Sequence, residues 1–141
     1  MSNILVETII SSDERLRNKP VDIVLKGGCR DELTELAEGL EAFRKSSGNL
    51  YHKVRASLFL WVIYRHYLQF HKEVLQYGTI PFPGIKAAYG RDYERAIDLY
   101  TDEIKNRGGL NGALCSAMAD AYYNVAFKYL LEQVRMSISH C

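Results

Sequence analysis

Residues 58–64 read Leu-Phe-Leu-Trp-Val-Ile-Tyr, the longest uninterrupted apolar run of the chain. Asn49 can cap a helix that begins at Leu50 and contains this run. Because apolar residues cover most of its circumference, we expect this helix to be the central, buried element of the fold. Its apolar pattern continues toward Gly78, so the helix is expected to extend in that direction, with or without a bend.

Three further segments carry apolar residues at helical spacing. A surface helix is predicted over 30–46, with acidic residues between its apolar positions, and another over 91–106. The last is predicted over 112–136, where closely spaced alanines allow close helix packing. Its expected core face consists of Leu114, Ala117, Met118, Ala121, Tyr122, Val125, Tyr129 and Val134.

Shorter elements are expected between and before these helices. Ser11 and Ser12 precede acidic residues and are typical of a helix N-cap, and 20–26 predicts a short helix with proline at its start. The two prolines of 79–84 predict a loop that is not regular helix, followed by a brief turn over 85–89. We therefore predict one compact all-α domain over 1–141, with five or six helices.

The composition describes an ordinary globular chain. It has 141 residues, of which 48% are apolar and 25% charged, and its net charge is +1. All ten tyrosines and the tryptophan follow residue 50, which places the expected core in the last two thirds. The three cysteines, Cys29, Cys115 and Cys141, contain no CxxC pair and indicate reduced thiols, with Cys115 expected in the core. No apolar run approaches the roughly 20 residues of a membrane span, and we expect a cytoplasmic protein.

The near-zero net charge conceals a basic middle segment. Residues 51–91 hold six basic side chains and one acidic one, whereas both flanks are net acidic. Basic groups interleaved with aromatic rings are compatible with a polyanion, but internal salt bridges or an acidic protein surface are favoured over nucleic acid. The candidate partner-binding residues at the edges of the central and repeat-like helices are Arg65, Tyr67, Lys72, Arg91 and Tyr93.

No motif in the sequence indicates catalysis, a cofactor or a metal site. His66 and His71 are five residues apart and do not share the helix face that a metal pair requires. A glycine-rich link before the last helix offers a possible anion site, formed by Lys105, Arg107, Gly108, Gly109 and Gly112. The favoured alternative is that Gly108 ends one helix and Asn111 caps the next.

The segment 91–100, Arg-Asp-Tyr-Glu-Arg-Ala-Ile-Asp-Leu-Tyr, resembles the second helix of a tetratricopeptide repeat. Ala121-Tyr122-Tyr123 falls close to where the first helix of a following repeat has its small and aromatic residues. One imperfect repeat does not make a solenoid, which needs about three repeats. We therefore expect a tetratricopeptide-like helical hairpin near the C-terminus.

Longer stretches resemble a known group of proteins. The stretches are FRKSSGNLYHKVRASLFLWVIYRHYL, GTIPFPGI, YERAIDLY and CSAMADAYYNVAFKYLLEQVRMSI, within residues 40–138. They are similar to the amino-terminal helical region of large bacterial proteins often labelled uridylyltransferases that make UDP-glucose. The resemblance implies an accessory helical module, with the chemistry of the family in sequence that this chain lacks. It carries over no functional residue.

These observations favour a non-enzymatic interaction or accessory domain. Such a domain would present a helix face to a protein partner or to the rest of a larger chain. The alternative is a phosphate- or nucleotide-binding regulatory module of a nucleotide-sugar enzyme, centred on the glycine-rich link.

Overall fold

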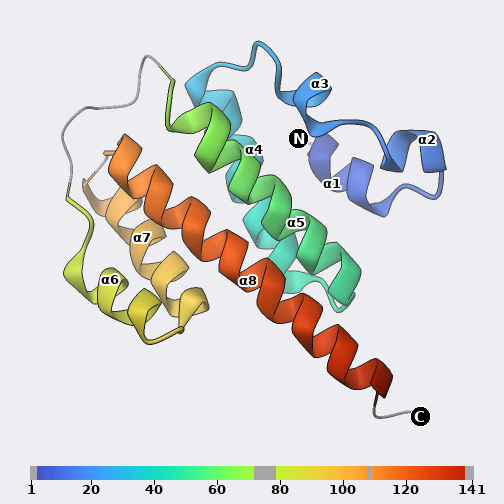
Figure 1. Cartoon of the computed structure of the whole chain (residues 1–141). Coiled ribbons are helices and arrows are strands. Elements are labelled where there is room, and N and C mark those ends of the chain that lie inside the picture. The colour runs from blue at the N-terminus through green and yellow to red at the C-terminus, as the bar shows by residue number, and fades with distance from the viewer. Residues whose placement is uncertain (1–2, 72–78, 108, 139–141) are drawn as a thin grey trace.

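The computed structural model describes residues 3–71, 79–107 and 109–138, and every regular element in these ranges is helical (Figure 1). The all-α prediction is confirmed. Eight α-helices occur in the described ranges, more than the five or six predicted, because short helices form on both sides of the central one. None of these helices combines the length and apolarity that crossing a bilayer requires.

The amino-terminal part contains three short helices, α1 (Ile4–Ile10), α2 (Glu14–Arg17) and α3 (Val21–Leu25). The side chain of Asn3 caps α1 by accepting from two backbone N–H groups, and its Nδ2 donates to the carbonyl of Leu36 at 2.9 Å. The side chain of Asp13 caps α2, and Pro20 precedes α3. These caps explain why such short segments begin where they do.

The core is centred on the last two thirds, as predicted, and it also extends into the first 50 residues. Five leucine and isoleucine side chains there are at most 1% exposed: Leu5, Ile9, Leu25, Leu33 and Leu40. The aromatic residues do follow residue 50, but aliphatic side chains of α1, α3 and α4 (Arg30–Ser46) complete the same apolar cluster. The bounds predicted for α4 are confirmed.

The central helix is α5 (Leu50–Val62), which Asn49 caps and which contacts α1, α4 and α8 (Gly112–Ile138). It continues as η1 (Ile63–Leu68), a π-helical turn in which the N–H of Gln69 bonds the carbonyl of Tyr64. The expected extension toward Gly78 lies in part outside the described residues. Within the described residues, the helix departs from regular α geometry at the wider π turn.

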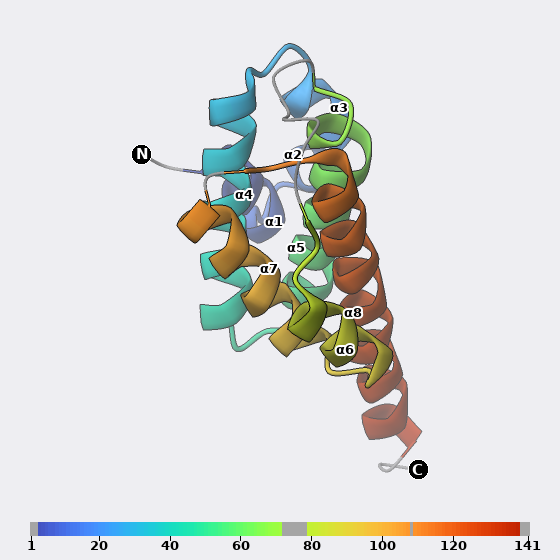
Figure 2. The same cartoon turned by 90° about the vertical axis from the view of Figure 1, so that its left-hand side faces the viewer.

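The last three helices are α6 (Phe82–Tyr89), α7 (Tyr93–Arg107) and α8. In this group, α7 packs against both α6 and α8 (Figure 2). The prediction of a non-helical stretch to Gly84 is wrong, because α6 begins at Phe82. Proline is tolerated in the first turn of a helix, where its missing N–H has no intrahelical partner. In both views, the last turns of α8 project beyond the other helices.

Candidate functional site

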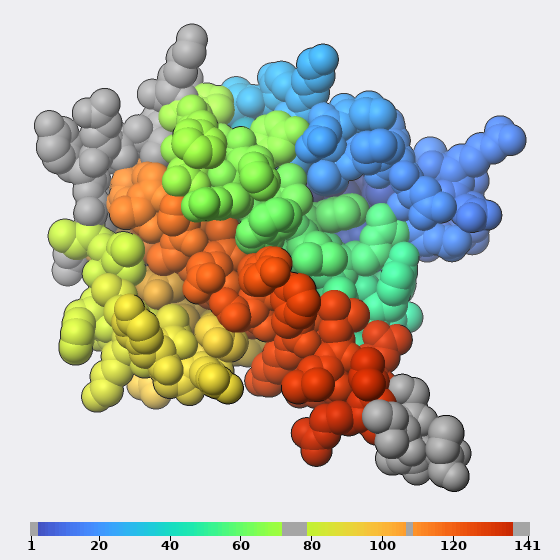
Figure 3. All heavy atoms as spheres, in the orientation of Figure 1, coloured from blue at the N-terminus to red at the C-terminus, as the bar shows by residue number. Residues whose placement is uncertain are grey.

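The carboxyl-terminal half of α8 carries an exposed apolar surface, here called the α8 stripe, formed by Tyr123, Phe127, Leu130 and Leu131. Their exposed fractions are 43%, 51%, 38% and 61%. The spacing of three and four residues places all four on one side of the helix. Val134 follows one turn later and is 54% exposed. It was predicted in the core, but α8 outruns its neighbouring helices there (Figure 3).

Aromatic contacts connect the α8 stripe to the central helix. The ring of Trp61 on α5 lies 6.0 Å from that of Tyr123, which lies 4.6 Å from Phe127. On the other side, Trp61 meets His66 of η1 edge to face at 5.2 Å. These half-buried and exposed rings therefore form one continuous aromatic row across α5, η1 and α8.

An open cavity of about 390 Å³ lies at the inner end of this row. Its lining residues are Trp61, Arg65, Ser116, Ala119, Asp120 and Tyr123. The guanidinium of Arg65 donates to the hydroxyl of Ser116 at 3.4 Å, which holds the cation beside the cavity. Two aromatic rings thus line the cavity together with one cationic side chain, Arg65, and one anionic side chain, Asp120.

Of the four predicted partner-binding residues that the structure describes, Arg65 alone lines this cavity. Tyr67 donates from its hydroxyl to Asp22 at 3.0 Å, which links η1 to α3. Tyr93 packs against the core, and exposed Arg91 adopts a φ of 61° in the link between α6 and α7. That link lies at the far end of the molecule from η1 in both ribbon views. Lys72 lies outside the described residues.

The glycine-rich link is used for helix capping. The side chain of Asn111 accepts from the N–H of Leu114 at 2.8 Å, which confirms that Asn111 caps α8, whereas the helix end predicted at Gly108 lies outside the described residues. Lys105 lines a different cavity, of about 230 Å³, beside Glu38 and Glu41 of α4. Gly109 precedes the cap and Gly112 begins α8. Arg107 ends α7, Gly108 lies outside the described residues, and anion binding there stays a prediction.

A buried ionic cluster joins α4, α7 and α8. Arg44 is 1% exposed and makes two hydrogen bonds to Glu41, at 2.7 and 2.9 Å, and two to Glu94, at 3.0 and 2.8 Å. It also donates to the hydroxyl of Tyr129 at 2.9 Å, and that hydroxyl donates to Glu94. Burial opposes the charge on Arg44, but the bonds to the two carboxylates outweigh it and raise the pKa of the guanidinium.

Two cations of the basic middle segment, Arg55 and Lys53, make internal contacts. The guanidinium of Arg55 lies over the rings of Tyr51 and Phe59 and donates to the carbonyl of Arg17 at 2.6 Å. The ammonium of Lys53 lies 5.8 Å from the ring centroid of Tyr129. These contacts favour internal use of the basic segment over a polyanion surface.

Burial controls the chemistry of the core thiol. Burial raises the pKa of the Cys115 thiol to about 12, so the thiol is protonated near neutral pH and a poor nucleophile. Within the described ranges, no grouping of three histidine, cysteine, aspartate or glutamate side chains has the geometry to hold a metal ion.

Comparison with known proteins adds no assignment. No family model, curated protein or solved structure matches the chain. The resemblance to the helical region of large bacterial proteins therefore stays a prediction, and the function has to be inferred from the geometry.

Proposed function

We propose that this chain is a non-enzymatic helical interaction domain whose docking surface is the α8 stripe. The observation that carries the proposal is the row that runs from half-buried Trp61 through exposed Tyr123 and Phe127 to exposed Leu131. Single exposed apolar residues are common on protein surfaces, whereas a contiguous row of large ones is typical of a binding surface.

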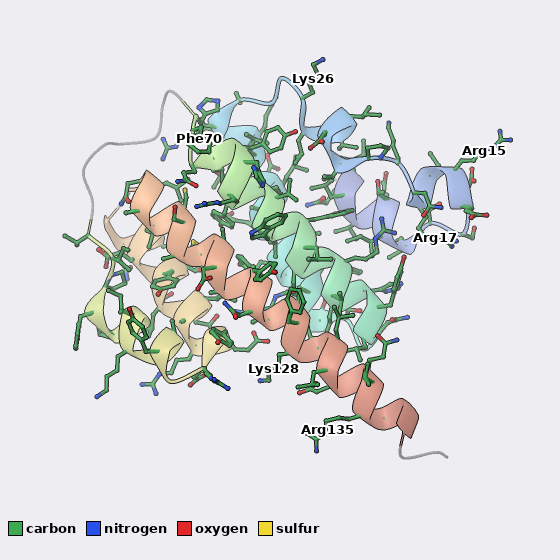
Figure 4. The ribbon with its side chains drawn as sticks, viewed as in Figure 1. Arg15, Arg17, Lys26, Phe70, Lys128 and Arg135 are labelled. Atoms are coloured by element: carbon green, nitrogen blue, oxygen red, sulfur yellow. The ribbon has the colours of Figure 1, made fainter. Side chains whose placement is uncertain are left out.

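The form of the surface favours a helix as the occupant. Ridges formed by residues three and four apart fit the grooves of a second helix. Asp120 stands beside the inner end of the row, and Lys128 and Arg135 point outward from α8 (Figure 4). An amphipathic helix with an apolar seam and charged edges would therefore cover the stripe while keeping its own charged groups in water.

The tetratricopeptide-like character of α7 and α8 belongs to the same proposal. Ala121 and Tyr122 are at most 1% exposed, and Gly84 of α6 lies against the ring of Tyr100 on α7. Small residues between large rings support a repeat-like hairpin that holds α8 in place. The free thiols of Cys29 and Cys115 support a cytoplasmic location.

A photo-reactive amino acid at position 127 tests the proposed function. Irradiation in cells of the source organism should cross-link the chain to a discrete species, and the captured peptide should be a helix with an apolar seam. Leu130→Glu in the same chain should abolish the product. A photo-reactive group at position 70 is the matched control, because Phe70 is 72% exposed and lies away from the stripe (Figure 4). Equal yields from both positions, or yields that Leu130→Glu leaves unchanged, would refute the proposal.

A further inference from the structure

We infer that the helix that packs on the α8 stripe is α8 of a second copy of this chain, in antiparallel orientation. This inference rests on the proposed function, since it names the partner for the same surface. It makes the molecule a two-fold symmetric dimer whose interface is the same patch on both subunits.

The spacing of the exposed residues is that of a coiled-coil seam. Tyr123, Phe127, Leu130 and Val134 are separated by four, three and four residues, which corresponds to the heptad positions d, a, d and a. In an antiparallel pair, position a of one helix meets position d of the other. A two-fold axis between residues 128 and 129 then sets Phe127 against the partner's Leu130, and Tyr123 against the partner's Val134.

This register is self-complementary in size. Each layer of the seam pairs one aromatic ring with one smaller aliphatic side chain, so neither layer is overfilled. A parallel pair would instead stack Phe127 on itself and Leu130 on itself, giving layers of unequal size. The exposed side chains therefore favour the antiparallel arrangement.

The register is also self-complementary in charge. The residues beside the seam that reach the surface are the uncharged Asn124, Leu131 and Gln133, so two identical surfaces meet there without repulsion. Asp120 and Arg135 lie on the same side of α8, one near each end of the stripe. Antiparallel pairing brings each Asp120 beside the partner's Arg135, which gives two symmetric ion pairs at the rim.

The shape of the molecule leaves room for this pairing. Because the last turns of α8 project beyond the other helices, a second α8 can lie along them without meeting α6 or α7 (Figures 1 and 2). An aromatic side chain contributes about 150–250 Å² when fully buried, and those of the stripe are only about half exposed. The interface thus falls below about 1,200 Å², which is typical of weak association with a Kd on the order of micromolar.

Sedimentation velocity over a range from low micromolar to several hundred micromolar protein tests the inference. The wild-type mass should rise from 16.1 kDa toward twice that value as concentration increases. Phe127→Glu and Leu130→Lys should each remain monomeric, because each buries an unpaired charge against an apolar residue. Both side chains are exposed in the single chain, so unchanged helical circular dichroism should accompany the loss. Phe70→Glu should dimerise like the wild type.

Mixing the two monomeric variants identifies the orientation. In the antiparallel register the glutamate at 127 meets the lysine at 130 of the other chain, while the second layer keeps its native Phe127 and Leu130. The equimolar mixture should therefore regain the dimer mass, with a Kd at least about tenfold lower than that of either variant alone. A parallel pair cannot form this complementary layer, so a mixture that stays monomeric while the wild type dimerises would overturn the register.

A wild-type chain that is monomeric at every concentration would overturn the second-copy inference. If position 127 still cross-links to a different protein in cells, the proposed function stands without it. If that cross-link is missing as well, both fail.

Discussion

Replacing Arg44 by methionine should destabilise the fold far more than a single charge removal at the surface would. The change keeps much of the side-chain volume but removes five hydrogen bonds, two to Glu41 within α4 and three that join α4 to Glu94 of α7 and Tyr129 of α8. It also leaves Glu41, which is 13% exposed, without its main cation. Removing one partner of a buried ion pair costs about 3–5 kcal/mol. Because the Glu94 side chain is 36% exposed and can be hydrated, we expect a loss near the lower limit, about 3 kcal/mol.

Urea unfolding followed by far-ultraviolet circular dichroism measures this loss, and thermal unfolding should show Tm reduced by about 10 °C. Lys45→Met is the matched control, since Lys45 pairs with Asp98 and Glu41 but is 51% exposed. An exposed pair contributes about 1 kcal/mol or less. If Arg44→Met and Lys45→Met lower the free energy of unfolding equally, the cluster does not stabilise the fold and the reasoning is wrong.

Three further outcomes are expected. Gly84→Ala would place Cβ 2.4 Å from the ring of Tyr100 and should lower the free energy of unfolding by about 1–3 kcal/mol. Gly48→Ala is the control, because its Cβ meets open space and should not lower the free energy of unfolding. Equal effects of the two substitutions in urea unfolding would contradict this. The bonds that Glu94 accepts from Arg44 and Tyr129 outweigh burial and lower its pKa below 4.5, so its ionised form stabilises the fold above that pH. This contribution is lost as pH falls through the folded-state pKa of Glu94. The free energy of unfolding should therefore decline more steeply in acid for the wild type than for Glu94→Gln. Parallel profiles of the free energy of unfolding against pH would exclude a stabilising role for ionised Glu94. Cys115 should react with a thiol reagent only after unfolding, and peptide mass spectrometry that finds it modified in the native protein would contradict its burial.

The helices that sequence reasoning located well are those with both a cap and a long apolar stripe. The bounds of α4 follow from its apolar spacing and from Gly48 after its end, and Asn49 fixed the start of α5. The helix α1 was missed although Asn3 marks its start, because seven residues carry too little periodicity to stand out. The start of α6 was misplaced because proline was treated as a helix breaker rather than as a first-turn residue.

The candidate site was harder to predict because it forms only in three dimensions. Trp61 and Tyr123 are 62 residues apart, and their contact depends on how α8 packs along α5. One local signal was available for the buried cluster: Arg44 continues the apolar stripe of α4 one turn beyond Leu40. An arginine at an inward position indicates buried carboxylates nearby, but their identity depends on the tertiary fold.

The π turn of η1 changes the phase of the central helix. One additional residue in a turn rotates everything that follows by about 100° relative to an unbroken α-helix. As a result, the helix directs Trp61, which precedes the turn, toward α8, and Tyr67, which lies within the turn, toward α3. Deleting one residue from the turn would rotate the residues that follow it by about 100° relative to Trp61 and turn them away from their present neighbours.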